Sequence, residues 1–161
     1  EEVSAWDIDV RPDFKGLPAG SGSVEEGETL WLEKCALCHG DFGDSNEVFS
    51  PIVLGNVTEE DMATGRVASL TDPAVVRTTL MKVATLSTLW DYINRAMPYG
   101  NEKSLQADEV YAITAYVLHL NGLVPATQAI NADNLSHIEM PNRNGFRELP
   151  GFRPISAEAT R

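Results

Sequence analysis

Cys35-Ala36-Leu37-Cys38-His39 is the stretch that decides the fold of this chain, because C-x-x-C-H is the attachment signature of a c-type haem. Two thiols three positions apart can form thioethers to both vinyl groups of one porphyrin. The histidine that follows them can then place its imidazole under the iron as the proximal ligand. The sequence therefore predicts one covalent haem c, bound by Cys35, Cys38 and His39.

Two other interpretations of this motif are weaker. Cys35 and Cys38 are the only cysteines of the chain, and a disulfide between them would indicate a thioredoxin-like redox pair. That alternative requires a βαβ pattern around the motif, and it gives His39 no role. A zinc site would need a second C-x-x-C or an H-x-x-x-H to complete four ligands, and the sequence contains neither.

Length, charge and the start of the chain limit the possible classes. The chain has 161 residues, enough for one core, and no apolar run that would span a membrane. The formal net charge of −12 argues against nucleic acid and anionic lipid, and favours a partner with a basic face; solubility is the other explanation. Because the chain begins without a basic and apolar leader, we expect that a secretory signal has been removed. Haem is attached to such motifs outside the cytoplasm, so we expect a periplasmic protein.

Glycine and proline positions divide the chain into three parts. Residues 1–23 contain two prolines and three glycines without a helical period, and they predict an extended arm. Residues 24–121 form the predicted haem domain. Residues 122–161 contain four prolines and no periodicity. They predict an irregular tail that is either disordered or laid against a partner.

Start and stop signals predict that the haem domain is all-α. Ser23 can cap a first helix, and the acidic residues after it favour the positive end of that helix. Pro98 ends one helix, since the residue before a proline disfavours the helical conformation, and Gly122 ends the last. The predicted helices run from Ser23 or Val24 to Glu33 or Lys34, from Thr58 to before Gly65, from Asp72-Pro73 through Leu80, from Leu86 to Ala96 and from about Gln106 to Asn121.

The first and last of these helices resemble a known family. Gly27 and Trp31 precede Cys35 at steps of four, and the last helix carries the stretch Ile-Thr-Ala-Tyr-Val at residues 113–117. These positions resemble class I cytochromes c, in which the glycine lets the first helix cross closely against the last one. The resemblance implies a class I cytochrome c fold around one covalent haem, with the arm and the tail added.

Longer stretches narrow the resemblance. The segments 87–98 (S-T-L-W-D-Y-I-N-R-A-M-P), 104–118 and 138–142 resemble the SoxD family, the cytochrome subunits of Sox-type sulfane dehydrogenase. The resemblance extends from Gly16 to Phe146. The W-D-Y-I-N-R-A-M-P run also occurs in thiosulfate dehydrogenase cytochromes. Some Sox cytochromes carry two haem domains, whereas this chain has one attachment motif.

Several residues could be the second axial ligand of the iron. Met97 stands 58 residues after His39, on a loop between two helices, and Pro98 restricts its approach. Such a loop can present a thioether to iron without helix geometry. We therefore predict His39 and Met97 as the iron ligands. The other candidates lie within a helix, too near His39, or in the tail: they are Met62, Met81, Met140, His119 and His137.

The resemblance also implies a role for Pro51. This residue follows His39 by twelve positions. In the family, a proline near this distance offers its backbone carbonyl to the Nδ1–H of the proximal histidine, which fixes the orientation of the ring. A proline that only forms a turn is the open alternative.

The function that the resemblance implies is electron transfer. A periplasmic subunit of this family accepts electrons from a molybdenum-cofactor subunit that oxidises protein-bound sulfane sulfur, and passes them to a downstream cytochrome. The chain has no cysteine outside the motif and no recognisable molybdopterin-binding pattern, so we expect it to serve an enzyme without being the catalyst. Two alternatives stay open. One is a free-standing diffusible carrier, which would not need the arm and tail. The other is a thiosulfate-oxidising haem enzyme, in which Met97 would not bind the iron.

The tail supplies the argument for a permanent partner. It carries four arginines and scattered apolar residues, and ordering such a segment costs about 1–2 kcal/mol per residue in backbone entropy. We therefore expect the tail to become ordered where these side chains find a surface, largely on a larger catalytic subunit. The apolar residues are Ile130, Leu135, Ile138, Met140, Phe146, Leu149 and Phe152.

Overall fold

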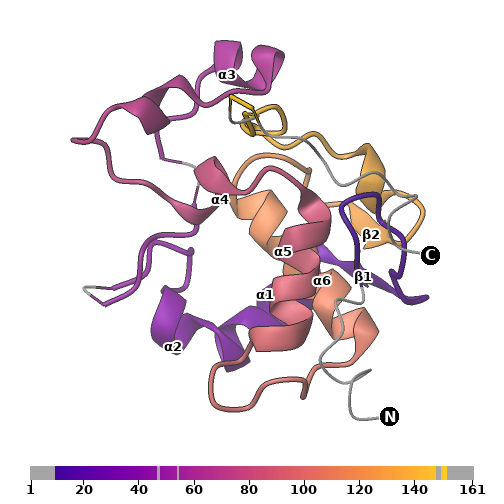
Figure 1. Ribbon diagram of the computed structural model, residues 1–161. Coiled ribbons are helices and arrows are strands. Elements are labelled where there is room, and N and C mark those ends of the chain that lie inside the picture. The colour runs from indigo at the N-terminus through magenta and orange to yellow at the C-terminus, as the bar shows by residue number, and fades with distance from the viewer. Residues whose placement is uncertain (1–9, 47, 54, 148–149, 152–161) are drawn as a thin grey trace.

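Helix α6 (Ala107–Leu120) is the centre of the fold, and the helices α1 (Val24–Lys34) and α5 (Leu86–Ala96) both pack on it (Figure 1). The residues of α6 from Val110 to Leu118 are all buried, as expected for a helix that is covered on every side. The computed structural model describes residues 10–46, 48–53, 55–147 and 150–151. Its shorter elements are β1 (Ser21–Ser23), α2 (Ala36–His39), α3 (Glu59–Thr64), the 3₁₀-helix η1 (Ala68–Thr71), α4 (Thr79–Lys82), β2 (Ala129–Asn131) and the 3₁₀-helix η2 (Leu135–His137).

Two helices begin at the caps that the sequence predicts. At α1, Ser23 Oγ accepts a hydrogen bond from Glu26 N at 3.2 Å, and the Glu26 carboxylate accepts one from Ser23 N at 2.9 Å. Thr58 and Asp61 form the same reciprocal capping box at α3. Gly65 ends α3 in the left-handed conformation, with φ +69°. Both predicted helix starts are confirmed.

Glycine allows α1 to lie against α6. A Cβ atom on Gly27 would overlap the backbone carbonyl of Ala112, so a larger residue would force the two helices apart. Gly22 makes an equally close approach to the backbone nitrogen of Ala112. The close crossing expected at Gly27 is confirmed. The role of Gly22 was not predicted, since the sequence analysis placed it in the arm.

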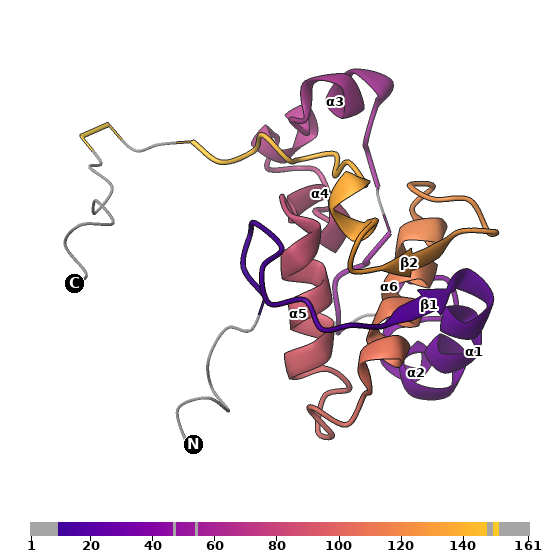
Figure 2. The ribbon, with the colours of Figure 1, turned by 90° about the vertical axis from the view of Figure 1, so that its right-hand side faces the viewer.

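A short antiparallel ribbon joins the arm to the tail. Strands β1 and β2 pair with Ser21 opposite Asn131 and Gly22 opposite Ile130, and Figure 2 shows them side by side next to α6. The sequence analysis did not predict these strands. Because each contains three residues, the fold remains predominantly helical, as predicted.

The helix predicted from Asp72-Pro73 is wrong. Residues 73–78 form turns and irregular structure, and only Thr79–Lys82 is helical. Asp72 Oδ1 instead accepts a hydrogen bond from Ala74 N at 2.8 Å, a local side-chain bond that competes with helix formation. Val76, an apolar residue of that segment, is 68% exposed.

The tail from residue 122 to residue 140 contributes to the core of its own domain. Ile130 and Leu135 are fully buried, Met140 is 2% exposed, and all three share one hydrophobic cluster with side chains of α5 and α6. This corrects the expectation that these residues become ordered largely on a partner subunit, because their apolar surface is already covered by the domain. Phe146 is 80% exposed, while Leu149 and Phe152 lie outside the described residues.

Candidate haem site

The C-x-x-C-H motif folds as one helical turn directly after α1. Cys35 N donates to Trp31 O at 2.8 Å, which completes the last turn of α1. The chain then turns into α2, and His39 N donates to Cys35 O at 3.0 Å. Residues three and four apart are neighbours on a helix, so Cys35, Cys38 and His39 lie next to one another.

The two cysteines have different surroundings. Cys38 is exposed, whereas Cys35 is half-buried, and both are free thiols in the structure. Burial raises the pKa of the Cys35 thiol to about 11, because the charged thiolate loses its hydration. At neutral pH the Cys35 thiol is therefore protonated, and the Cys38 sulfur is accessible. Thioether formation requires both of these sulfur atoms.

His39 is half-buried, and its buried Nδ1 atom makes no hydrogen bond with any of the described residues. Leaving a buried nitrogen unpaired costs stability. Burial also lowers the pKa of the imidazole, which favours the neutral ring that binds a metal. The ring centroid lies 5.8 Å from that of Trp31 and 5.8 Å from that of Phe49. These properties fit a ligand of a haem iron.

Two hydrogen bonds fix the chain that follows the motif. Trp31 Nε1 donates to Gly40 O at 2.9 Å, and Tyr116 Oη donates to Asp41 O at 3.1 Å. The rings of Trp31 and Tyr116 lie 5.9 Å apart. The sequence analysis quoted both aromatic residues for their helix positions, but it did not predict these bonds.

The sequence analysis missed Asn46. Its Nδ2 donates to Cys38 O at 3.1 Å, and its Oδ1 accepts from Val48 N at 2.8 Å. Asn46 therefore folds the loop back on the second cysteine. The only signal for it was the concentration of Gly, Asp and Asn after the motif, which marks a loop and does not identify the residue.

The loop that carries Pro51 is connected to the motif by backbone hydrogen bonds. Ser45 N donates to His39 O at 2.7 Å, and Ile52 N donates to Gly43 O at 2.8 Å. The carbonyl of Pro51 accepts from Thr79 N at 2.9 Å. No described residue bonds to His39 Nδ1, so the bond from His39 to Pro51 stays a prediction. A carbonyl oxygen has two lone pairs, so Pro51 can accept a second bond.

Met97 lies where the sequence analysis placed it, at the end of α5. Its N–H donates to Ile93 O at 3.3 Å, the side chain is half-buried, and the peptide bond to Pro98 is cis. Met97 follows Ile93 and Trp90 at helical spacing, and both are buried. It therefore extends the buried face of α5 beyond the end of the helix.

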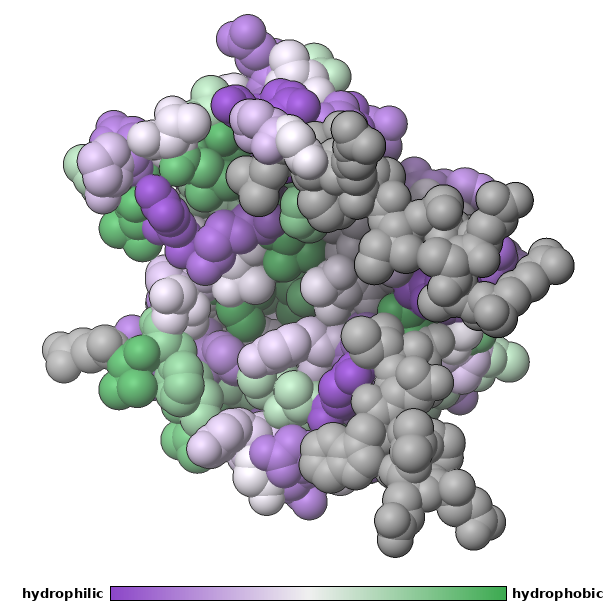
Figure 3. Space-filling model, in the orientation of Figure 1, coloured by the Kyte–Doolittle hydropathy of each residue, from purple (hydrophilic) through white to green (hydrophobic). Residues whose placement is uncertain are grey.

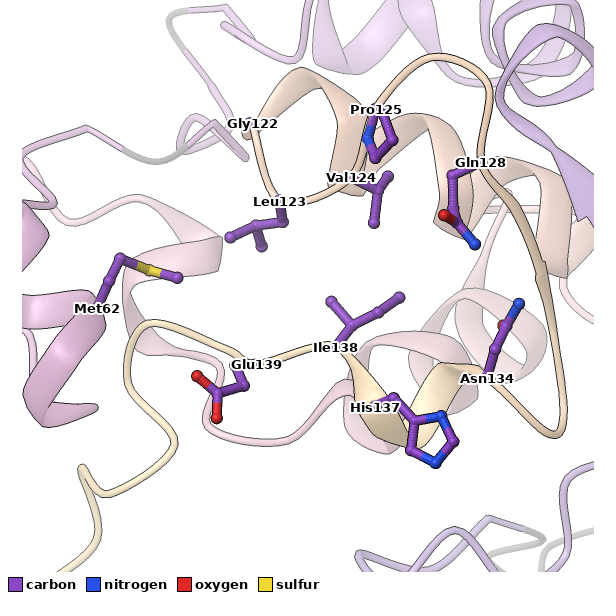
Figure 4. Close-up of a pocket in the computed structure, with 10 residues that line it drawn as sticks. All are labelled: Met62, Gly122, Leu123, Val124, Pro125, Gln128, Asn134, His137, Ile138 and Glu139. Atoms are coloured by element: carbon purple, nitrogen blue, oxygen red, sulfur yellow. The ribbon is translucent and has the colours of Figure 1, made fainter.

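The other candidate ligands have different surroundings. Met81 and Met140 are buried in the core at 0% and 2% exposure. His119 Nδ1 is 3.1 Å from Val124 O, within hydrogen-bond distance, and His137 is exposed on η2. Met62 lines a cavity of about 410 Å³ under the tail, into which Leu123, Val124 and Ile138 point (Figure 4). No residue of the predicted haem site lines that cavity.

Hydrophobic side chains are exposed in and after the motif. Leu37 is 95% exposed, Phe42 66% and Val48 81%. Figure 3 shows hydrophobic residues beside a hollow on the face that it displays. Exposed apolar surface beside a hollow commonly marks a place where another molecule binds. The surface therefore fits a porphyrin or a docked protein.

Comparisons with known proteins agree with this site. The profile of the family described as "Cytochrome C oxidase, cbb3-type, subunit III" matches residues 22–117. A solved structure, "Crystal Structure of the Sulfane Dehydrogenase SoxCD from Paracoccus pantotrophus", has 36% sequence identity and a TM-score of 0.78; the similarity covers 98% of this chain and 76% of that chain. No curated protein sequence matches the chain.

The fold is that of a class I c-type cytochrome, which confirms the predicted fold class. The chain belongs to the cytochrome c domain family that takes its name from subunit III of cbb3-type cytochrome c oxidase. The predicted resemblance to the cytochrome subunit of Sox-type sulfane dehydrogenase is also confirmed. Within the described residues, no helix combines the length and the hydropathy that crossing a membrane requires.

Proposed function

We propose that this chain is a periplasmic electron-transfer subunit that binds one covalent haem c through thioethers at Cys35 and Cys38, with His39 and Met97 as axial ligands. The observation that carries the proposal is the motif itself: two free cysteines followed directly by His39, a half-buried histidine whose buried Nδ1 is unpaired within the described part of the chain. When bound, the haem supplies an iron that alternates between the ferric and ferrous states and so carries one electron.

The surrounding residues have separate tasks in this proposal. Trp31 and Phe49 flank the ring of His39 and keep water away from it. The Pro51 carbonyl would accept the Nδ1–H of His39 and hold the ring in one orientation. Met97 would bind from the end of α5, and a thioether ligand raises the reduction potential relative to a second histidine.

The proposed electron donor is a molybdenum-cofactor dehydrogenase subunit of sulfur oxidation. The similarity to a chain of the sulfane dehydrogenase SoxCD supports this assignment. Both cysteines of the chain belong to the haem motif, so the sulfur chemistry would belong to the partner. The proposed acceptor is a downstream cytochrome, and the net charge of −12 favours one with a basic docking face.

A free-standing diffusible carrier is the second candidate, and one observation favours it. The described tail residues Ile130, Leu135 and Met140 are buried in the domain itself, so this part of the tail does not need a partner. Under this alternative the acidic surface would steer the protein to transient partners of opposite charge.

Native purification distinguishes these two candidates. We expect iron and molybdenum to co-elute in size-exclusion chromatography, with the haem staying attached to this polypeptide after denaturation. Elution as an iron-containing monomer without molybdenum would favour the diffusible carrier. The absence of covalently bound haem would contradict both.

A further inference from the structure

Arg143 in the tail closes the C-terminal end of α3. Its Nη1 donates to Met62 O at 2.7 Å, and its Nη2 donates to Ala63 O at 3.4 Å. The last carbonyls of a helix have no partner within the helix, and a guanidinium presents several donors in one plane. The ion pair of Arg143 with Glu139, at 3.4 Å, involves a carboxylate that is 69% exposed and so contributes little.

Asn144 completes this contact with the next two carbonyls. Its N–H donates to Gly65 O at 2.8 Å, and its Nδ2 donates to Thr64 O at 2.9 Å. Four consecutive carbonyls, those of residues 62–65, thus receive hydrogen bonds from the tail. A Cβ on Gly65 would lie 2.8 Å from Arg143 Cγ, so the tail lies directly on the end of the helix.

Asn142 extends the contact from α3 to α4. Its Oδ1 accepts from Val67 N at 3.3 Å, and its Nδ2 donates to Lys82 O at 3.5 Å. Lys82 is the last residue of α4. We call residues 142–144 the tail clasp, because together they bind both ends of the segment from α3 to α4.

Helix α4 connects the tail clasp to the haem site. Its first residue, Thr79, donates its N–H to Pro51 O at 2.9 Å, and Leu80 N donates to Ile52 O at 3.3 Å. Ile52 N in turn donates to Gly43 O at 2.8 Å, four residues after His39. Helix α4 is therefore bonded at its last residue to Asn142 of the tail clasp and at its first residues to the loop that would orient the histidine.

We propose that Arg143, supported by Asn142 and Asn144, is a positioning residue for the haem: it fixes the end of α3, Asn142 carries this contact to α4, and α4 holds the Pro51 loop that follows His39. The inference rests on the proposed haem function, and it assigns that function a further residue. It also gives the tail motif at 138–142 a task within the domain.

The test compares Arg143→Ala with Arg147→Ala in the full haem-containing chain. Arg147 is exposed and its loss changes the net charge equally, so it is the matched control. The measurements are the midpoint potential, the weak far-red methionine–iron absorption band, and hydrogen exchange of peptides covering residues 59–82. We expect Arg143→Ala to shift the potential, weaken the band and speed exchange several-fold. Arg143→Lys should restore these properties only in part, and Arg147→Ala should leave them unchanged.

Three results would overturn the positioning role. One is faster exchange in Arg143→Ala with an unchanged potential and band, which would leave a purely structural contact. Another is an equal shift of the potential in Arg147→Ala, which would reflect charge alone. The third is a wild-type chain without haem, which would overturn the proposed function as well.

If Arg143→Ala does not fold, Asn144→Ala, which removes the side-chain bond to Thr64 O, is judged by the same criteria.

Discussion

Lys34 Nζ lies 2.8 Å from Glu109 Oε1, and this ion pair joins the last turn of α1 to the first turn of α6, one residue before the haem motif. The side chains are 29% and 26% exposed, so water screens the pair only in part. Their mutual hydrogen bond is the main reason why the pKa of Lys34 is raised and the pKa of Glu109 is lowered. The pair therefore stabilises the crossing from which Cys35 extends.

Glu109 should make the stability of the domain depend on acid pH. Because the pKa of Glu109 in the folded protein lies below its usual value of 4.5, its contribution is fully present above the unfolded pKa and is lost as the pH falls through the folded pKa. Glu109→Gln should cost about 0.5–1 kcal/mol near neutral pH and less in acid. Urea unfolding at several pH values measures this. An identical loss at every pH would contradict the assignment.

Lys34 should act at the opposite end of the pH scale. Its folded pKa is raised above 10.5, so its contribution is present below the unfolded pKa and is lost as the pH rises through the folded pKa. A double-mutant cycle measures the coupling between the two side chains. The free energy of unfolding lost by Lys34→Met and Glu109→Gln together should be smaller than the sum of the losses in the two single variants. Additive losses would show that the pair does not couple the helices.

Replacing Gly27 should separate α1 from α6. In Gly27→Ala, the new methyl group would overlap the backbone carbonyl of Ala112, which cannot move away as a flexible side chain can. We expect a loss of about 1–3 kcal/mol or more, measured as a lower melting temperature of the haem-containing protein. Thr29→Ala, at an exposed position of the same helix, is the control and should change the melting temperature little.

Local signals predicted the ends of several helices. Of the contacts between distant segments, the crossing at Gly27 followed from the family resemblance, whereas those of the tail could not be predicted. Helix α5 covers Leu86–Ala96 as expected, because its apolar period and the following Met97-Pro98 are both local. Arg143 contacts a carbonyl 81 residues away, and nothing near Arg143 in the sequence indicates that partner. Asp72 shows that a local signal can also predict the wrong structure. Its bond to Ala74 N forms a turn and competes with the helix start that Asp-Pro also permits.

The residues of the candidate site also fall into those that local sequence predicts and those that it does not. The motif itself identified Cys35, Cys38 and His39, because three chemical requirements meet within five residues. The aromatic neighbour Phe49 and the loop residue Asn46 contact the motif only through the path of the loop. Patterns of spacing predict helices, and they do not predict the course of an irregular loop.

Met97→His should lower the midpoint potential and abolish the methionine–iron band, because a second histidine replaces the thioether. Met62→Leu is the control, since Met62 lines the cavity under the tail and its loss should leave the band unchanged. Optical redox titration and absorption spectroscopy measure both effects. If the band survives Met97→His, Met97 is not the ligand, and Met81 or Met140 becomes the candidate.

Two truncations should separate the structural part of the tail from a partner-binding part. Deleting residues 123–161 removes Ile130, Leu135 and Met140 from the core, and each large apolar side chain removed from a core costs about 2–5 kcal/mol. We therefore expect this deletion to destabilise the haem domain strongly. Deleting residues 146–161 keeps those residues and the tail clasp, so the melting temperature and haem spectrum should stay close to those of the full chain.

The shorter deletion also tests the partner. It removes Phe146, an aromatic side chain that is 80% exposed and of the kind enriched where proteins bind one another. We expect the haem domain without residues 146–161 to co-purify less with a molybdenum-containing subunit. The single variant Phe146→Ala should show part of the same loss. If both proteins retain the subunit as well as the full chain does, the tail after residue 145 does not hold the partner, and the interface must lie on the haem domain.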